Sequence, residues 1–557
     1  MAKGIQLQYW FVLLEIMKYK ERLAMNDFWK TRSNTKDKYV FCEDDEVSVY
    51  CLGAIAYYVD NNISTNVLKI AHCILDDSLD FNYLYGFYKI VIYDKVKDNY
   101  FFWGDNAGSQ RFFVDYTKVI FADSLLALRN WRKADLKPCY SAIALLLQEN
   151  GALTDETLVE GIKITDTEKY YTFNKLGIKE YDKGLLNFTE NKGRTLSEIM
   201  DIELEIVKDA SFCAVCTGGM DSRTILAHLS YAKKTPALIV TGHKGNPDIE
   251  VAKEVADALR LPLTIKDPSK KSQDWIQEAF LFSDGIYDTV LSYRHYQKGL
   301  WAYENGFRYE FGGVGGEFYK NTYCQMFRQR LLGKKVTAEL LYQALIGYAI
   351  HCPSWAGPEL MKAYDETKDV VMPIIEERME KGLLPSCNRI GLRILQGKYC
   401  SITNNIAEFC VKIDPLMERD VIAAVNNISP LKLAMGVWQR REIKRFCPKL
   451  SNIKTDQGYS CSMNFFKLTK ERFQRLFFVL GRIVLRIRRL LRLPYVDRCE
   501  NYWNNDYIEA SKTNEYEESI EICKKLGLIN DKLTKDDIPL ASVGNILQIG
   551  MFFKGSI

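Results

Sequence analysis

The residues best suited to chemistry follow an apolar run at Phe212–Val215, which predicts a buried strand. The run leads into Thr217-Gly-Gly-Met-Asp-Ser222, after which apolar residues recur at helical spacing. Two adjacent glycines let the backbone approach a ligand closely and leave its N–H groups uncovered. The start of a helix adds a partial positive charge, and Thr217 and Ser222 add hydroxyl groups. The sequence therefore predicts a phosphate-binding loop, made of Thr217, Gly218, Gly219, Met220, Asp221, Ser222 and Arg223.

The carboxylate of Asp221 indicates a metal ion in this loop. The chain contains no G-x-x-x-x-G-K-[ST] sequence, so the loop is not a Walker A loop. An anion beside phosphates is favourable when Mg²⁺ lies between them. We expect Asp221 to bind Mg²⁺; the alternative is an ordinary glycine-rich turn between a strand and a helix.

The loop resembles the S-G-G-x-D-S pyrophosphate loop of the ATP pyrophosphatase superfamily, with Thr217 in place of the usual serine. Members of that superfamily cleave ATP between its α- and β-phosphates and activate a substrate as its adenylate. The resemblance implies ATP and Mg²⁺ as cofactors.

A second glycine-rich segment, Tyr309–Phe318, resembles the "l-x-G-x-G-[GS]-D-E" segment of asparagine synthases. The resemblance implies that Glu317 is a second Mg²⁺ ligand. Val314 stands where that family usually has a carboxylate that positions or deprotonates the attacking amine. The chain therefore lacks that carboxylate. For Glu317, a solvated glutamate in a glycine-rich loop is the alternative.

The segment Cys447–Ser460 resembles a family segment whose lysine reaches the ATP phosphates. Strict spacing puts Asp456 at the lysine position, whereas a slightly shifted loop puts Lys454 there. Negative charge builds up on the phosphoryl oxygens during adenylation, so a cation is needed. We assign that role to Lys454; a solvated loop lysine is the alternative.

The surrounding elements alternate between strands and helices. Ala237–Thr241 and Leu263–Ile265 are predicted strands, and a helix is predicted to begin at Pro247. This alternation predicts a parallel sheet with helices on both faces and ligands at the carboxyl ends of its strands. The resemblance implies that adenine lies at the end of the second strand, against Val240, Thr241 and Gly242.

The first 130 residues have the pattern of a strand-rich domain. Aromatic and β-branched runs alternate with turn formers. The runs are Val47–Leu52, Tyr88–Tyr93, Tyr100–Trp103 and Arg111–Val114, followed later by Val159–Ile164 and Tyr170–Phe173.

Leu84–Asp94 and Asp105–Phe113 resemble segments of class II glutamine amidotransferase domains. That family attacks glutamine with an N-terminal cysteine, but Ala2 stands at this position and a methyl group is no nucleophile. The resemblance implies an Ntn-like β-sandwich domain without glutaminase activity; an unrelated β-rich domain is the alternative.

The composition is that of a soluble globular protein. The chain has 557 residues, a formal net charge of +4 and 15 scattered cysteines, which favour a reducing cytosol. Cys213 and Cys216 are interpreted as core residues rather than as a zinc or redox site. We predict an amidotransferase-like domain at 1–195, a synthetase domain at 196–465 and a helical extension at 466–557. The predicted class is thus α/β and α+β, with a helical C-terminal part.

Some features leave their roles open. His243 is interpreted as a hydrogen-bonded loop residue, and Asp284 and Asp288 as either a solvated turn or part of a substrate pocket. Residues 471–492 read as a basic amphipathic helix. It could lie on an anionic membrane surface, bind an acidic substrate, or pack on the synthetase domain with its arginines outward.

These observations predict an asparagine synthase-like ligase that adenylates a carboxylate and passes it to an amine. The amine would be free ammonia or an amino group of the substrate itself, as in β-lactam synthetases and lasso-peptide cyclases. We expect a cytoplasmic location and no nucleic-acid partner, and a homodimer is compatible with the sequence. The alternatives are a scaffold protein that has lost catalysis, a conventional asparagine synthase that uses ammonia, and a tRNA-modifying pyrophosphatase.

Overall fold

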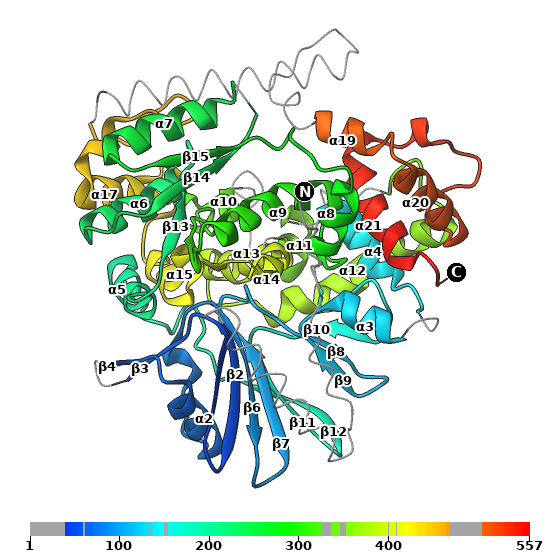
Figure 1. The fold of residues 1–557 in the computed structure, drawn as a ribbon, viewed down its shortest axis with the longest axis horizontal. Coiled ribbons are helices and arrows are strands. Elements are labelled where there is room, and N and C mark those ends of the chain that lie inside the picture. Colours follow the sequence, from blue (N-terminus) through cyan, green and yellow to red (C-terminus); the bar gives the residue numbers. More distant parts are fainter. Residues whose placement is uncertain are drawn as a thin grey trace.

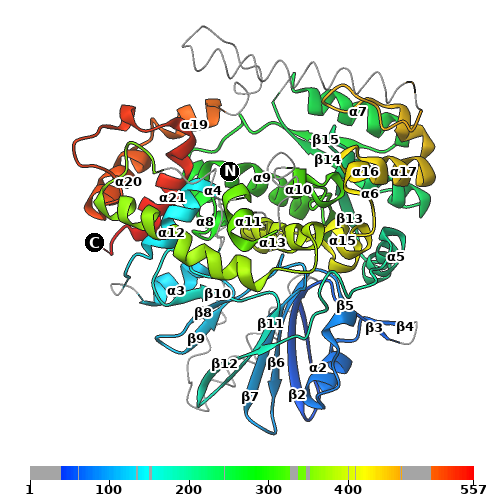
Figure 2. The ribbon, with the colours of Figure 1, turned by 180° about the vertical axis from the view of Figure 1, so that it is seen from behind.

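The structure is a computed structural model. It describes residues 39–59, 62–132, 136–149, 154–243, 245–325, 336–345, 352–398, 400–407, 409–464, 466 and 504–556. Antiparallel sheets form the N-terminal part, and a parallel five-stranded sheet with helices follows (Figures 1 and 2). This arrangement confirms the coarse α/β class. Ala2 and the predicted basic helix at 471–492 lie outside the described residues.

The N-terminal part is built on a six-stranded sheet of order β1-β2-β6-β7-β11-β12, in which all neighbours are antiparallel. Its interior is aromatic: the ring centroids of Phe102 lie 3.9 Å from Phe121 and 5.2 Å from Tyr171. Two smaller sheets have the orders β10-β8-β9 and β4-β3-β5. The strands are β1 Tyr39–Glu43, β2 Val47–Gly53, β3 Ala56–Val59, β4 Asn62–Ser64, β5 Leu84–Tyr85, β6 Tyr88–Asp94, β7 Asn99–Gly104, β8 Phe113–Asp115, β9 Ile120–Ala122, β10 Ile162–Ile164, β11 Lys169–Asn174 and β12 Gly177–Asp182.

Two predicted strands are shorter than expected. The strand predicted to begin at Arg111 begins at Phe113, because the Arg111 N–H donates to Asn404 Oδ1 at 3.0 Å instead of to a neighbouring strand. The strand predicted from Val159 begins at Ile162, because Gly161 adopts a turn conformation with φ of 77°. In both places a local turn or a distant partner replaces sheet pairing.

The N-terminal part and the junction also contain helices. Helix α5 begins with a capping box, in which Thr195 and Glu198 satisfy each other's backbone N–H groups. The elements are α2 Val67–Leu75, the 3₁₀ turn η1 Phe81–Tyr83, α3 Leu125–Arg132, α4 Tyr140–Glu149 and α5 Leu196–Ile206.

The parallel sheet has the order β15-β14-β13-β16-β17, and every neighbouring pair is parallel. Strand β13 is central: β14 and then β15 are added on one side of it, and β16 and then β17 are added on its other side. The strands are β13 Phe212–Val215, β14 Ala237–Thr241, β15 Leu263–Lys266, β16 Tyr309–Phe311 and β17 Val411–Ile413. In such a sheet the order reverses between β13 and β16, and ligands bind at the carboxyl ends of that pair.

The sequence analysis did not predict β17. Three buried residues form this strand, which is too short to show a periodic pattern. Its pairing with β16 places Lys412 beside Glu310 and aligns the loop after β17 with the loop after β16.

Helices cover the sheet and extend to the C-terminal part. Helices α6 and α17 pack on each other, where His228 Nε2 lies 2.9 Å from Glu442 Oε2 and the His228 ring rests on Phe446. The helices and 3₁₀ turns are α6 Met220–Tyr231, α7 Pro247–Leu259, α8 Trp275–Ser283, α9 Thr289–Glu304, η2 Phe318–Lys320, α10 Thr322–Gln325, α11 Ala338–Leu345, α12 Pro358–Glu377, α13 Leu383–Lys398, α14 Cys400–Ile406, η3 Pro415–Met417, α15 Arg419–Val425, α16 Pro430–Ala434, α17 Val437–Phe446, η4 Pro448–Asn452, α19 Asn504–Ala510, α20 Asn514–Lys525, η5 Lys535–Asp537, η6 Leu540–Ser542 and α21 Val543–Phe553. Within the described ranges, no helix combines the length and apolarity needed to cross a bilayer.

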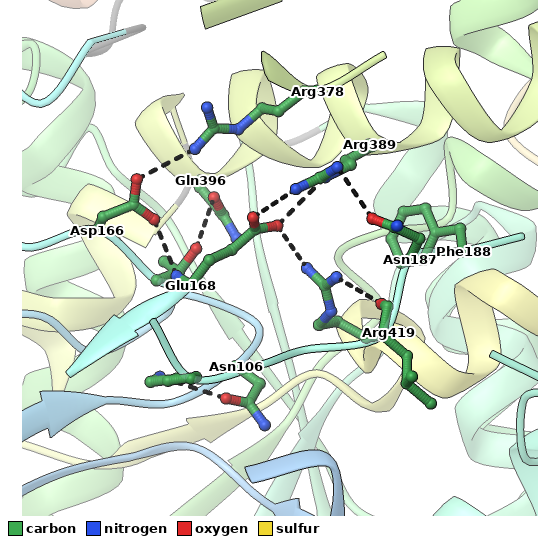
Figure 3. A network of polar contacts seen from close by, with 12 residues as sticks. Asn106, Asp166, Glu168, Asn187, Phe188, Arg378, Arg389, Gln396 and Arg419 are labelled. Carbon is green, nitrogen blue, oxygen red and sulfur yellow. Dashed lines mark hydrogen bonds and ion pairs between the residues drawn. The ribbon is translucent and has the colours of Figure 1, made fainter. Parts of the chain in front are cut away.

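Buried ion pairs join the antiparallel part to the helical part (Figure 3). Glu168 accepts from Arg389 Nη2 at 2.6 Å and from Arg419 Nη1 at 3.0 Å. Burial alone would raise the pKa of Glu168, but these arginines lower it to about 2. Arg378 pairs in the same way with Asp166 at 3.2 Å. The proposed boundary at residue 195 stays a prediction, and contacts of this kind link the two sides of it.

Asp284 and Asp288 fit neither role left open by the sequence, because both are buried and hold helix ends. Asp284 accepts from Ser124 Oγ at 2.6 Å and from the Leu125 N–H at 2.7 Å, so it caps α3. Asp288 accepts from the Leu291 N–H at 2.9 Å and from the Tyr507 hydroxyl at 3.1 Å. These carboxyls connect segments that are distant in sequence.

The burial of Asp284 predicts that the free energy of unfolding of the protein depends on pH. Burial raises its pKa to about 7, above the value of an unfolded aspartate, although the hydrogen bonds from Ser124 and Leu126 lower it. Between these two pKa values the native state keeps a proton on Asp284 that the unfolded state loses. The stabilisation by this proton is therefore complete below about pH 4 and is lost as the pH rises to about 7. In Asp284→Asn this dependence should disappear, so the free energy of unfolding of the variant relative to wild type should rise by on the order of 1–3 kcal/mol between pH 5 and 7.5. Urea unfolding at the two pH values measures this difference, and equal differences at both would contradict the assignment.

Candidate functional site

Two glycine-rich loops meet where the sheet order reverses. One follows β13 and runs from Thr217 to Ser222, and the other follows β16 and runs from Gly312 to Glu317. They approach so closely that a Cβ on Gly313 would lie 2.6 Å from the Ser222 nitrogen. A Cβ on Gly316 would lie 2.5 Å from Asp221 Oδ2 and closer still to the carboxyl carbon. Gly313 and Gly316 are therefore required by contact with the first loop.

Gly219 differs from these glycines. A Cβ there would meet only Thr217 Oγ1, at 3.6 Å. It is also the N-cap of α6, and no side chain of the described residues caps this helix. The first-turn N–H groups of α6 therefore lack a side-chain cap from the described part of the chain, and at the end of the sheet they favour an anion.

The hydroxyl groups of the first loop face each other. Thr217 Oγ1 lies 2.8 Å from Ser222 Oγ, which also accepts from the Thr217 N–H at 3.1 Å. The Gly219 N–H points at Thr217 Oγ1 at 3.4 Å. These contacts shape the loop, so a phosphate would be bound chiefly by the α6 N-terminus.

A carboxylate already occupies one N–H group of the loop. Asp248, in the first turn of α7, accepts from the Gly218 N–H at 2.5 Å. Burial raises the pKa of Asp248, the Gly218 hydrogen bond lowers it, and the negative charge of Asp456 raises it further. The sequence analysis named Gly218 as a nucleotide ligand and missed Asp248, which follows the predicted helix start at Pro247.

Asp221 and Glu317 lie on the two facing loops, as the predicted metal site requires. Asp221 Oδ2 pairs with Lys320 Nζ at 2.7 Å, and Asp221 Oδ1 accepts from Gln439 Nε2. Burial and then the charge of Asp221 raise the pKa of Glu317. Burial would lower the pKa of Lys320, but Asp221 and Glu317 outweigh it and raise the pKa. The cation thus stabilises two carboxylates that would otherwise repel each other.

The donor set fits Mg²⁺ together with a phosphate ligand. No group of three or more His, Cys, Asp or Glu side chains among the described residues is arranged to hold a metal ion alone. Mg²⁺ is commonly held by one or two carboxylates together with phosphate oxygens and water. Asp221 and Glu317 can supply the carboxylates beside an open helix N-terminus.

Arg223 ties the first loop to the segment that contains Lys454. Its guanidinium is fully buried and donates to the carbonyls of Ile453 at 2.7 Å and Lys454 at 3.1 Å. It also donates to the Gly218 carbonyl at 3.2 Å. The predicted nucleotide ligand Arg223 therefore uses its side chain to hold two loops together.

The structure brings Lys454 to the site through its backbone. The segment turns back on itself, with an isolated bridge between Lys454 and Ser460. The Asp456 N–H donates to the Gly218 carbonyl at 3.2 Å, while the Lys454 side chain is exposed. Lys454 and Asp456 both lie near the loop, and the assignment of the cation role to Lys454 stays a prediction.

The predicted adenine contacts lie at the end of β14. Val240 has a buried side chain, and the Gly242 N–H donates to the Lys266 carbonyl at 3.0 Å. Of these three residues, the backbone and the Thr241 side chain remain to meet a base. His243 Nδ1 lies 3.3 Å from Asp267 Oδ1, which agrees with the interpretation as a hydrogen-bonded loop residue.

Two cavities lie away from this site. A cavity of about 430 Å³ lies at the β15 edge instead, lined by residues that include Lys266, Tyr293 and Trp301. Another of about 360 Å³ lies between α3, α8, α20 and α21. The case for the site rests on sheet topology, facing loops and polar groups.

Lys320 and Gln439 are the polar partners that sequence reasoning missed. Lys320 carries a weak signal, because it stands three residues after Glu317 and so about one helical turn away. Gln439 lies 218 residues from Asp221, and nothing local marks it.

Comparisons with known proteins add little. No protein-family profile matches the chain, and no curated protein is similar to it. Among solved structures, the chain is similar to glutamine phosphoribosylpyrophosphate amidotransferase from B. subtilis, complexed with ADP and GMP. The identity is 13% and the TM-score 0.17, over 42% of this chain and 48% of that chain, so the match spans about half the length of each. A likeness of this size carries no argument about function.

Proposed function

We propose that the protein is an asparagine synthase-like ligase that binds Mg-ATP where β13 and β16 end. The observation that carries this proposal is the meeting of two glycine-rich loops at the sheet's reversal point, with Asp221 and Glu317 facing each other. This is the position at which open parallel sheets bind ligands.

Each residue then has a distinct role. The open N-terminus of α6 binds phosphate, and Gly219 lets it approach. Asp221 and Glu317 hold Mg²⁺, which neutralises phosphate charge when bound. Lys454 or Lys320 supplies a further cation near the developing negative charge.

The reaction has two steps. A carboxylate oxygen of the substrate attacks the α-phosphorus of ATP, and the bond from that phosphorus to the bridging oxygen breaks to release pyrophosphate. An amine nitrogen then attacks the acyl carbon, its proton is lost and AMP leaves. The base for the second step is not supplied by Val314, so we infer that the substrate's own groups or solvent accept the proton.

ATP–pyrophosphate exchange tests this proposal. The panel is aspartate, N-acyl amino acids, uronic acids and acidic peptides, with and without ammonia. The exchange of pyrophosphate into ATP should occur with only one carboxylate of this panel. Asp221→Asn should lower the exchange rate by about 100-fold or more, because the variant no longer stabilises the charge of the metal and phosphates. Asp201→Asn, an exposed carboxylate on α5, should leave exchange unchanged.

A scaffold protein that only binds nucleotide is the second candidate. Asp248 on the Gly218 N–H and Lys320 on Asp221 favour it, because protein groups already fill two positions of the site. Nucleotide binding without exchange for any carboxylate would select this candidate. Exchange with aspartate and amidation by ammonia would instead identify a conventional asparagine synthase.

A further inference from the structure

Lys320 lies on a turn that is fixed by packing, and its side chain is partly exposed. Its turn, η2, is fixed by Phe318 and Tyr319, both fully buried. The Tyr319 hydroxyl donates to the Leu416 carbonyl at 3.0 Å, and its ring stacks on Trp438 at 4.3 Å. The Lys320 side chain itself is 32% exposed, so solvent and ligands can reach its ion pair.

The two oxygens of Asp221 are held differently. Gln439, which holds Oδ1, is fully buried. Lys320, which holds Oδ2, is partly exposed and flexible. A metal ion that approaches Asp221 from solvent therefore meets the ammonium of Lys320 and can replace it without disturbing Gln439.

We propose that Lys320 is an exchangeable counter-ion of the nucleotide site. It pairs with Asp221 when no divalent ion is bound, and it moves to phosphate oxygens when Mg²⁺ takes the carboxylate. This inference rests on the proposed function and assigns regulation to the same site.

The exchange couples metal binding to nucleotide binding. Without nucleotide, a divalent ion must displace the ammonium into water, which weakens metal binding. With nucleotide, the displaced ammonium gains a phosphate partner, and this new ion pair offsets the free energy lost when Lys320 leaves Asp221. Metal and nucleotide should therefore bind together far better than either binds alone.

Binding of Mn²⁺ tests the exchange without requiring catalysis. Free Mn²⁺ is measured by electron paramagnetic resonance, alone and with α,β-methylene-ATP, whose α–β linkage cannot be cleaved. Lys320→Gln should bind Mn²⁺ alone about 10-fold more tightly than wild type, because the competing cation is gone. In the presence of the analogue the variant should lose that advantage and bind the analogue about 10-fold more weakly.

Two further variants complete the experiment. Lys320→Arg keeps the charge and should restore wild-type coupling at least in part, whereas Asp221→Asn should abolish the Mn²⁺ site with or without nucleotide. Thermal melts confirm that each variant is folded, and Lys320→Met replaces Lys320→Gln if that variant is not.

The outcomes separate the two proposals. If wild type binds Mn²⁺ with the analogue through Asp221, but Lys320→Gln titrates like wild type, the role of Lys320 is wrong and the proposed function stands. If wild type binds no analogue under any condition, both are wrong. Tighter Mn²⁺ binding with lost coupling in Lys320→Gln supports both.

Discussion

Gly316→Ala should abolish nucleotide-dependent chemistry while the protein stays folded. The added methyl would lie 2.5 Å from Asp221 Oδ2 and closer to its carboxyl carbon, so Asp221 must leave Lys320 and Gln439. Gly316 does not have a positive φ, so an alanine adds no backbone strain there. We expect Mg-ATP binding and exchange to fall by about 100-fold, and the free energy of unfolding to fall by about 1–3 kcal/mol.

Gly219→Ala is the matched control for stability in this experiment. Its methyl would touch only Thr217 Oγ1 at 3.6 Å, so urea unfolding should match wild type. If phosphate passes over Gly219, this variant should still bind nucleotide more weakly than wild type. Wild-type affinity in Gly316→Ala would show that Asp221 is free to rotate away and does not serve the site.

Arg223→Met should cost the protein both stability and nucleotide binding. The fully buried guanidinium donates to carbonyls on both loops, at Gly218, Ile453 and Lys454. Methionine keeps the apolar volume but removes these donors. The Gly218 carbonyl keeps the Asp456 N–H, whereas the carbonyls of Ile453 and Lys454 lose the guanidinium, at about 1–3 kcal/mol each when they remain buried. We expect unfolding to become easier by about 3–5 kcal/mol in total, and the segment 453–461 to become a protease target.

Arg441→Met, an exposed arginine on α17, is the control for loss of charge. It should leave urea unfolding and the proteolysis pattern unchanged. Full stability in Arg223→Met, or cleavage equally distributed along the chain, would show that Arg223 does not fasten the loop.

Local sequence was sufficient to predict the strand before the first loop and the helix after it. The apolar run at β13, the paired glycines and the helical spacing after Met220 are short-range patterns, and the structure places strand, loop and helix within those bounds. The same holds for β14, whose predicted and observed residues coincide. Apolar periodicity reports which face of an element is buried, so it needs no knowledge of the partner.

The sequence could not show which loops become neighbours. The loop after β16 lies about 90 residues from the first, and no local pattern indicated that its Gly313 and Gly316 contact Ser222 and Asp221 of the first loop. Asp284 illustrates the same limit: its neighbours Ser124 and Leu125 are about 160 residues away, so a turn residue in sequence is a buried helix cap in space. Side-chain roles of this kind depend on long-range packing.

By itself, the sequence determined a strand–glycine loop–helix unit, an α/β class and a pair of candidate carboxylates, because each follows from residue type and short spacing. Only the tertiary structure decided that β17 completes the sheet and that its order reverses between β13 and β16. It also decided that Lys320 and Gln439 hold Asp221. These contacts join residues about 100 to 220 positions apart, and such contacts arise from the way whole elements pack rather than from any local pattern.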